Sequence, residues 1–350
     1  MIYCEKMINL KNRLQHIEKT LDNFLPERIT SSWISQSFGE LAYGLPDSFF
    51  LNIINPVKDL VKCGGKRWRP LLCVLSCEFA EGDPEKAYPL TPLIEFCHTA
   101  SLVHDDIEDK SDTRRGAPAA HIKYGLDTAL NSASWLYFEA LNPLINYGTS
   151  ESVKAEIYSL YSQNLRRLHL GQSMDIGWHS NPDIIPSVDE YITMISLKTG
   201  SLAKLAGELG FIAACKPMDE VLEYGKLMTD IGIGFQILDD VKNITEGNAG
   251  KRRGDDIVEG KKSLPLIFYT EENPEGAEKI KLLFKQAAKE GIESPSVEVC
   301  IEAICSSKAV KRAEEYGKKI VEASLIKLQN NYKQNEAKEL IFDLFNTILR

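Results

Sequence analysis

Residues 84–109 read PEKAYPLTPLIEFCHTASLVHDDIED, and this stretch decides the fold class of the chain. Within it Leu93, Cys97 and Ala100 follow one another at steps of three or four residues, the spacing that puts apolar side chains on one face of an α-helix. The same spacing recurs from about Leu10 onward, whereas alternating runs rich in Val, Ile and Thr are nearly absent. The sequence therefore predicts an all-α protein.

The periodic pattern also sets the expected boundaries of the other helices. Glycine and proline end or restart them, as at Gly64-Gly65 and Lys216-Pro217. No linker rich in Ser or Pro and no repeat divides the sequence, so we expect a single domain over residues 1–350. The polar, glycine-punctuated stretch 245–260 is expected to be a mobile loop. Besides 84–109, helices are predicted over residues 5–24, 31–41, 47–63, 68–80, 125–147, 151–180, 188–213, 218–244, 263–270, 275–289, 297–305 and 308–349.

Composition limits the functional classes that fit the chain. Of 350 residues, 43% are hydrophobic, 26% are charged and 38 are Gly or Pro (23 and 15), which excludes disordered and collagen-like proteins. The 41 basic and 50 acidic residues give a net charge of −9, which argues against a nucleic-acid partner. The charged N-terminal residues MIYCEKMINLKNRLQH and the absence of any run of about 18 apolar residues predict neither secretion nor a transmembrane segment.

Eight cysteines lie mostly in apolar helical stretches, at positions 4, 63, 73, 77, 97, 215, 300 and 305. A chain of this size needs no disulfides for stability, so we expect reduced thiols and a cytoplasmic protein. Cys73 and Cys77 could share a metal ion, but no second pair follows at zinc spacing. The sequence therefore favours ordinary core cysteines.

A first acidic cluster ends the helix quoted above. Residues 104–116 read HDDIEDKSDTRRG, and on a helix Asp105, Asp106 and Asp109 fall within an arc of about 100°. Three converging carboxylates repel one another unless a cation binds, and such hard oxygen ligands suit Mg²⁺. A solvated helix end remains an alternative for these residues taken alone.

A second acidic cluster repeats this geometry 134 residues later. In GFQILDDVKNI (234–244), Asp239, Asp240 and Asn243 have the same spacing as the first cluster, and Gln236 lies one turn earlier. Facing each other across a bundle, the two clusters would hold metal ions around a polyphosphate. Asn243 keeps an oxygen but lacks the charge, so we expect the second metal site to be the weaker one.

Cations gather beside these carboxylates although the chain is acidic. The segment GGKRWRP (64–70) places three basic residues after a glycine pair at a helix start, where backbone amides also favour anions. The other candidates are Arg114, Arg115, Lys198 in the tripeptide KTG, Lys251 and Lys261.

Taken together, these motifs resemble the polyprenyl (isoprenyl diphosphate) synthase family over about residues 57–265. GKRWRP, HDDIEDKSDTRRG, KTG, FQILDDVKN and GKKSLP occur in the order of that family. The closest similarity is to eukaryotic-type geranylgeranyl diphosphate synthases, from which a helical N-terminal extension at about residues 1–50 departs. The resemblance implies an isoprenoid-synthase-type helical bundle with a central cavity, a Mg²⁺-dependent prenyltransferase and a homodimer.

The resemblance also assigns roles to individual residues. It implies that isopentenyl diphosphate is condensed with an allylic diphosphate, which is dimethylallyl, geranyl or farnesyl diphosphate. Mg²⁺ on the allylic diphosphate is expected to bind Asp105, Asp106, Asp109, Asp239 and Asp240, which with Lys198 form the catalytic set. The allylic diphosphate itself is expected to bind Arg114, Lys198, Lys251 and Lys261, with Thr199 and Gln236 lining its site. Isopentenyl diphosphate is expected to bind Lys66, Arg69, His98 and Arg115.

Product length is predicted from the depth of the cavity below the first acidic cluster. Ala100 and Ser101 lie about one turn deeper and are small, so a growing tail can pass them. Tyr137, Phe138 and His169 match the bulky positions of the pocket floor in the family, although ordinary helix packing also explains aromatic residues. We expect a C20 product, with longer chains as the alternative.

Two other functional classes remain as alternatives. A non-catalytic regulatory subunit would be expected to lose part of an acidic motif or the adjacent arginines, and this chain departs only at Asn243. A metal phosphohydrolase of the HD type is suggested by His98 and by His104-Asp105, but the remaining histidines form no supporting pattern.

Overall fold

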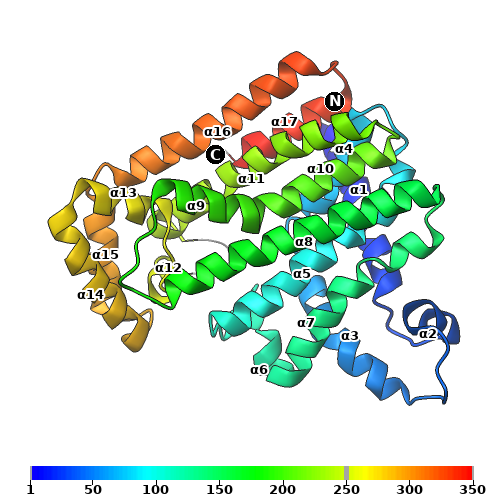
Figure 1. Ribbon diagram of the computed structural model, residues 1–350, viewed down its shortest axis with the longest axis horizontal. Coiled ribbons are helices and arrows are strands. Elements are labelled where there is room, and N and C mark those ends of the chain that lie inside the picture. The colour runs from blue at the N-terminus through cyan, green and yellow to red at the C-terminus, as the bar shows by residue number, and fades with distance from the viewer. Residues whose placement is uncertain (1, 248–251, 349–350) are drawn as a thin grey trace. The chain divides into compact units, whose positions relative to one another are not determined.

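The computed structural model describes residues 2–247 and 252–348, and in this part of the chain nearly all regular secondary structure is helical (Figure 1). This confirms the all-α prediction. The α-helices are α1 (Ile2–Phe24), α2 (Ser31–Phe38), α3 (Asp47–Lys62), α4 (Trp68–Phe79), α5 (Thr91–Glu108), α6 (Ala120–Tyr124), α7 (Leu126–Glu139), α8 (Glu151–His179), α9 (Val188–Ile195), α10 (Ser201–Ala213), α11 (Met218–Thr245), α12 (Asp255–Val258), α13 (Leu264–Glu272), α14 (Pro274–Glu290), α15 (Pro295–Cys305), α16 (Ala309–Asn331) and α17 (Glu336–Ile348).

Short elements of other kinds join these helices. Three 3₁₀ turns are η1 (Pro84–Lys86), η2 (Tyr88–Leu90) and η3 (Asn142–Asn146), and a π-helical turn, η4 (Ser196–Gly200), separates α9 from α10. The strands β1 (Thr113–Arg114) and β2 (Ala117–Pro118) pair antiparallel, with Arg114 opposite Ala117.

The chain divides into two compact units, each built from separate stretches of sequence. Unit 1 comprises Met1–Ser162, Leu205–Tyr224 and Glu336–Lys338, and unit 2 comprises Gln163–Lys204, Gly225–Asn335 and Glu339–Arg350. The single domain expected from the sequence remains a prediction.

In unit 1, α5 lies at the centre and packs against α3, α4 and α7. Leu93, Cys97 and Ala100, which define its apolar face, are completely buried. The neighbouring Cys73 and Cys77 of α4 are buried as well, as expected for core cysteines. The first acidic cluster therefore stands at the end of a helix that is packed in the core of its unit.

In unit 2, α9, α11 and α13 share one apolar core. Tyr191, Ile237 and Phe268 are among its buried members. Helices α11 and α16 approach closely at Gly234, where an added Cβ would lie 2.4 Å from Val321 Cγ2. This packing fixes the part of α11 that leads into the second acidic cluster.

Four predicted helices differ from the structure. The segment 84–109 becomes α-helical only at Thr91, after two 3₁₀ turns that each contain a proline in the first turn. The segment 125–147 ends as an α-helix at Glu139, before the proline-containing turn η3. The π-helical turn interrupts 188–213, and 308–349 forms the two helices α16 and α17.

The predicted loop 245–260 is only partly irregular. Its last part contains α12, whose Ile257 is buried against α14 and α15. Gly254 begins that helix with a φ of +87°, and an added Cβ there would lie 2.6 Å from Val297 Cγ1. The mobility and closure of the loop remain predictions, and residues 248–251, including Gly250 and Lys251, lie outside the described residues.

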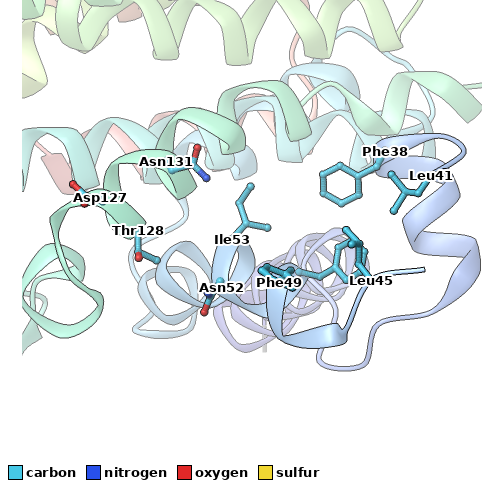
Figure 2. Close-up of a pocket in the computed structure, with 10 residues that line it drawn as sticks. Phe38, Leu41, Leu45, Phe49, Asn52, Ile53, Asp127, Thr128 and Asn131 are labelled. Carbon is cyan, nitrogen blue, oxygen red and sulfur yellow. The ribbon is translucent and has the colours of Figure 1, made fainter. Parts of the chain in front are cut away.

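An apolar groove opens in unit 1 between α2, α3 and α7 (Figure 2). Its volume is about 460 Å³. Its lining includes none of the residues predicted to limit product length, so this groove is separate from the predicted tail pocket. It is lined by Phe38, Leu41, Leu45, Phe49, Phe50, Asn52, Ile53, Asp127, Thr128 and Asn131.

Candidate active site

Three of the four residues expected to bind isopentenyl diphosphate meet around the turn between α3 and α4. Arg69 Nη1 lies 3.4 Å from His98 Nε2 of α5, and the Arg69 guanidinium lies 4.4 Å from the centre of the Trp68 ring. Arg115 Nη1 donates to the Leu60 carbonyl at 3.1 Å, at the end of α3. The fourth residue, Lys66, is exposed on the same turn. We call Lys66, Arg69, His98 and Arg115 the basic cluster.

The charge state of His98 follows from its surroundings. Burial, and after it the cations of Arg69 and Arg115, hold the pKa of His98 well below its ordinary value. The imidazole is therefore neutral at pH 7 and can donate a hydrogen bond from one nitrogen while accepting with the other.

A tight hairpin turn directs the two arginines that follow the first acidic cluster. Arg115 has a φ of +52° and Gly116 a φ of +77°, and the turn joins β1 to β2. Two successive positive φ angles are typical of a two-residue hairpin turn. Arg114 thereby reaches back to α5, whereas Arg115 reaches the end of α3.

Asp106 is the buried member of the first acidic cluster. Its side chain is 1% exposed, and its Oδ1 accepts from Arg114 Nε at 2.7 Å. Burial raises the pKa of Asp106, and the hydrogen bond from Arg114 opposes this shift. The second oxygen, Oδ2, is buried and accepts no hydrogen bond from any described residue.

The other two members of the first acidic cluster are partly exposed. Asp105 Oδ2 lies 3.9 Å from Arg114 Nη2, and Asp109 directly follows the last residue of α5. Within residues 2–247 and 252–348, no group of three or more His, Cys, Asp and Glu side chains is arranged closely enough to hold a metal ion. The carboxylate donors and the buried Asp106 Oδ2 nevertheless fit a hard divalent cation.

In unit 2, Asp240 ends a chain of hydrogen bonds. Thr199 Oγ1 donates to Gln236 Oε1 at 2.8 Å, and Gln236 Nε2 donates to Asp240 Oδ1 at 2.8 Å. Tyr191 Oη donates to Asp240 Oδ2 at 2.7 Å. Burial raises the pKa of Asp240 to about 7, and the negative charge of Asp256 acts in the same direction. The structure thus brings together three of the predicted site residues of unit 2, namely Thr199, Gln236 and Asp240.

The remaining members of the second acidic cluster differ in burial. Asp239 is partly exposed, whereas Asn243 is 2% exposed. The Asn243 backbone carbonyl accepts from Gly254 N at 3.4 Å, beside α12. Its side-chain nitrogen Nδ2 has no hydrogen-bond partner among the described residues. The expectation of a weaker metal site at Asn243 remains a prediction.

The predicted lysines have carboxylate partners. Lys198 Nζ lies 2.7 Å from Asp175 Oδ2, and Lys261 Nζ lies 2.7 Å from Glu259 Oε2. Lys251 is outside the described residues.

Two acidic residues were missed in the sequence analysis. Asp175 of α8 orients Lys198, and Asp256 of α12 acts on Asp240. A signal for the first was available in GQSMD (171–175). At Gly171 an added Cβ would lie 2.5 Å from Lys198 N, so only glycine allows α8 and η4 to approach this closely.

The residues predicted to limit product length differ in burial, and Ala100 and Tyr137 are the buried ones. Ala100 is completely buried, and Ser101 Oγ donates to the His98 carbonyl at 2.8 Å. The Tyr137 ring is buried and stacks on His104, with ring centres 5.7 Å apart and planes at 8°.

Phe138 does not line the interior of unit 1 as expected, because its side chain is 75% exposed. Adjacent residues of a helix point about 100° apart, and on α7 this rotation carries Phe138 out to the surface while Tyr137 faces inward. His169 of α8 is also exposed. Neither exposed side chain closes a pocket floor within its own unit.

Comparison with known proteins identifies the family of the chain. The model of the polyprenyl synthetase family matches residues 52–303. The chain belongs to this family. It is 32% identical over 304 residues to a geranylgeranyl diphosphate synthase of Sulfolobus acidocaldarius, covering 79% of this chain and 91% of that protein. It is 31% identical over 334 residues to a geranylgeranyl pyrophosphate synthase of Neocamarosporium betae, covering 91% and 92%.

A solved structure has the same fold. The geranylgeranyl pyrophosphate synthase of Corynebacterium glutamicum, complexed with isoprenyl diphosphate and magnesium, is similar with a TM-score of 0.81 at 24% identity, over 97% of this chain and 99% of that chain. Family membership confirms the resemblance, makes the chain a prenyltransferase and excludes the phosphohydrolase alternative. In the described part of this family member, no helix combines the length and apolar character needed to cross a membrane.

Proposed function

We propose that the protein condenses isopentenyl diphosphate with an allylic diphosphate and releases geranylgeranyl diphosphate. One observation carries the proposal: within unit 1, the basic cluster and the first acidic cluster are joined through one hairpin. Arg114 of that hairpin pairs with Asp106, and Arg115 donates to the Gly64 carbonyl of the turn that contains Lys66 and leads to Arg69. A site for an anion thus adjoins carboxylates that suit a metal-bound diphosphate.

Mg²⁺ is part of the proposal. The residues that would hold it are Asp105, Asp106 and Asp109 in unit 1, and Asp239 and Asp240 in unit 2. Mg²⁺ held by these carboxylates would neutralise charge on the leaving diphosphate, which would assist breaking of the allylic C–O bond.

Basic side chains of the chain also stabilise the negative charge of the allylic diphosphate. Arg114, Lys198, Lys251 and Lys261 bind the allylic diphosphate and stabilise the charge that develops on it. Asp175 supports this role, because its carboxylate accepts a hydrogen bond from Lys198 Nζ and so orients the ammonium group.

The basic cluster holds the second substrate. Lys66, Arg69 and Arg115 bind the diphosphate of isopentenyl diphosphate, and the neutral His98 donates a hydrogen bond to it. Its double bond then attacks the allylic carbocation, a C–C bond forms, and a proton passes to the departing diphosphate. The apolar face of α5, with Ala100 completely buried, excludes water that would quench the carbocation.

Product length follows from the side chains along α5 and α7. Ala100 and Ser101 leave room for a tail, and the stacked rings of His104 and Tyr137 are the barrier we propose for a C20 product. The exposure of Phe138 favours a second candidate, a synthase of longer chains, because it removes one bulky side chain from the proposed floor.

Assembly and location complete the proposal. Helix α7 exposes Leu126, Leu130 and Phe138 to 52%, 44% and 75%, and such apolar exposure supports a homodimer that covers them. The seven cysteines whose side chains are described are free thiols, as is typical of the cytoplasm, where we place the protein.

The test is incubation of the purified protein with Mg²⁺, isopentenyl diphosphate and farnesyl diphosphate, followed by chromatography of the products. A C20 diphosphate is expected. Absence of elongation with dimethylallyl, geranyl and farnesyl diphosphate alike would contradict the catalytic proposal and favour the regulatory subunit. Products well beyond C20 would contradict the proposed barrier.

A further inference from the structure

Arg67 lies in the turn between α3 and α4, beside the basic cluster, and its backbone is unusual. It immediately precedes α4 with φ +48° and ψ +25°, in the left-handed region. Residues other than glycine adopt this conformation rarely. Such a conformation persists where surrounding contacts determine it.

The Arg67 side chain supplies those contacts. Its guanidinium is 2% exposed, so it is out of reach of a substrate. Arg67 Nε donates to Glu18 Oε1 at 2.7 Å, and Nη1 donates to Glu95 Oε1 at 2.7 Å. Glu95 of α5 is itself buried, and burial raises the pKa of its carboxyl group. The positive charges of Arg67, Arg115 and Arg69 oppose this rise, and that of Arg67 opposes it most.

The same guanidinium also holds the backbone of the turn. Arg67 Nη2 donates to the Val61 carbonyl of α3, and Nη1 donates to the Gly64 carbonyl at 3.5 Å. Arg115 Nη1 donates to that same Gly64 carbonyl. At Gly65 an added Cβ would lie 3.0 Å from Arg115 Nη2, so the turn and the two arginines fit together closely.

These contacts connect Arg67 to every member of the basic cluster. Lys66 precedes it in the chain, Arg69 follows two residues later, and Arg115 shares its carbonyl partner. Glu95 lies one helical turn before His98 on α5, so the Arg67–Glu95 pair fixes the turn against the helix that carries the imidazole.

We propose that Arg67 is a positioning residue for isopentenyl diphosphate, and that Glu18 couples the N-terminal helix α1 to the binding of this substrate. The inference rests on the proposed function. It gives the N-terminal extension a role, because Glu18 belongs to α1 and its carboxylate orients the guanidinium that holds the turn. The Glu18 side chain is 45% exposed, so replacing it leaves no buried cavity.

The experiment compares two variants that each remove one ion pair between α1 and the rest of unit 1. Glu18→Gln weakens the pair with Arg67, whereas Arg13→Gln removes the pair in which Arg13 Nη2 lies 2.7 Å from Glu78 Oε2, on α4. Binding of isopentenyl diphosphate is measured by calorimetry, and KM for each substrate and kcat are measured in the elongation assay. Thermal unfolding reports on any general loosening of α1.

Glu18→Gln should raise the Kd and KM for isopentenyl diphosphate about tenfold, the size of effect expected when this hydrogen bond loses the negative charge of its acceptor. Its KM for the allylic diphosphate and its kcat should stay unchanged, and Arg13→Gln should bind isopentenyl diphosphate like the parent. Arg67→Lys keeps the positive charge but lacks the several N–H donors of the guanidinium. It should also raise the Kd and KM for isopentenyl diphosphate.

Unchanged Kd in Glu18→Gln would overturn the inference, as would an equal change in Arg13→Gln or a parallel rise in the allylic KM. A parent that binds isopentenyl diphosphate without elongating any primer would contradict the proposed function instead, and the binding comparison would still decide the role of Glu18.

Discussion

Replacing Glu139 by Gln should stabilise the protein at alkaline pH and leave it nearly unchanged at acidic pH. The Glu139 side chain lies on α7 and is almost completely buried, at 3% exposure of the residue. Its Oε1 accepts from Asn142 Nδ2 at 2.6 Å and from Ser37 Oγ at 3.1 Å. A glutamine oxygen can accept both bonds, so the substitution removes the charge and keeps the hydrogen-bond pattern.

The magnitude follows from the pKa of Glu139. Burial raises it from 4.5 to about 7, against the two hydrogen bonds. Because the folded protein binds this proton more tightly than the unfolded chain, its contribution to stability is full below pH 4.5 and is lost as the pH rises to about 7. A difference of about 2.5 pKa units corresponds to about 3 kcal/mol.

Urea unfolding at pH 8.5 and at pH 5 measures the effect. At pH 8.5 the free energy of unfolding of Glu139→Gln should exceed that of the parent by up to about 3 kcal/mol, and at pH 5 the excess should fall below about 1 kcal/mol. Glu151→Gln, at a side chain that is 89% exposed, is the matched control and should not show this difference. An excess of the same size at both pH values would refute the reasoning.

Three further outcomes test the site. Asp105→Ala and Asp239→Ala should each lower turnover at saturating Mg²⁺ by at least about 100-fold with an unchanged circular dichroism spectrum, because each removes a carboxylate that would bind a metal ion. The loss should be larger at Asp105, and near-parental elongation in both variants would contradict the metal sites. Tyr137→Ala should lengthen the product seen by chromatography, because it removes the ring stacked on His104; an unchanged product places the floor elsewhere. Phe138→Asp should shift the protein from dimer to monomer in sedimentation, whereas a parent that sediments as a monomer would contradict the homodimer.

The fold class was predictable because helical spacing is a local property of the sequence. The boundaries failed where the structure deviates from a regular α-helix. At Thr91 two preceding 3₁₀ turns delay the helix, and the buried Tyr88 and Leu90 of the second turn continue the apolar spacing of the helix. The strands on either side of Arg115 are only two residues long, too short to show any alternation.

The site was predictable in its residue types and less so in its contacts. The motifs identified Lys198 and Arg115, but their partners Asp175 and the Gly64 carbonyl come from other elements, and only the folded chain brings them together. The left-handed backbone of Arg67 also carries no signal in the sequence, because most residues found there are glycine, asparagine or aspartate.

The π-helical turn η4 has an evolutionary consequence. Such a turn amounts to one extra residue within an α-helix and lowers helix stability, and turns of this kind are frequent at functional sites. Deleting Ser196 should restore a regular helix through this region and yield a chain that is harder to unfold. The same deletion would turn Lys198 by about 100° away from Asp175, and the stabilised enzyme would lose its function. Selection for thermostability alone would therefore favour variants that erase this turn, whereas selection for prenyl transfer preserves it.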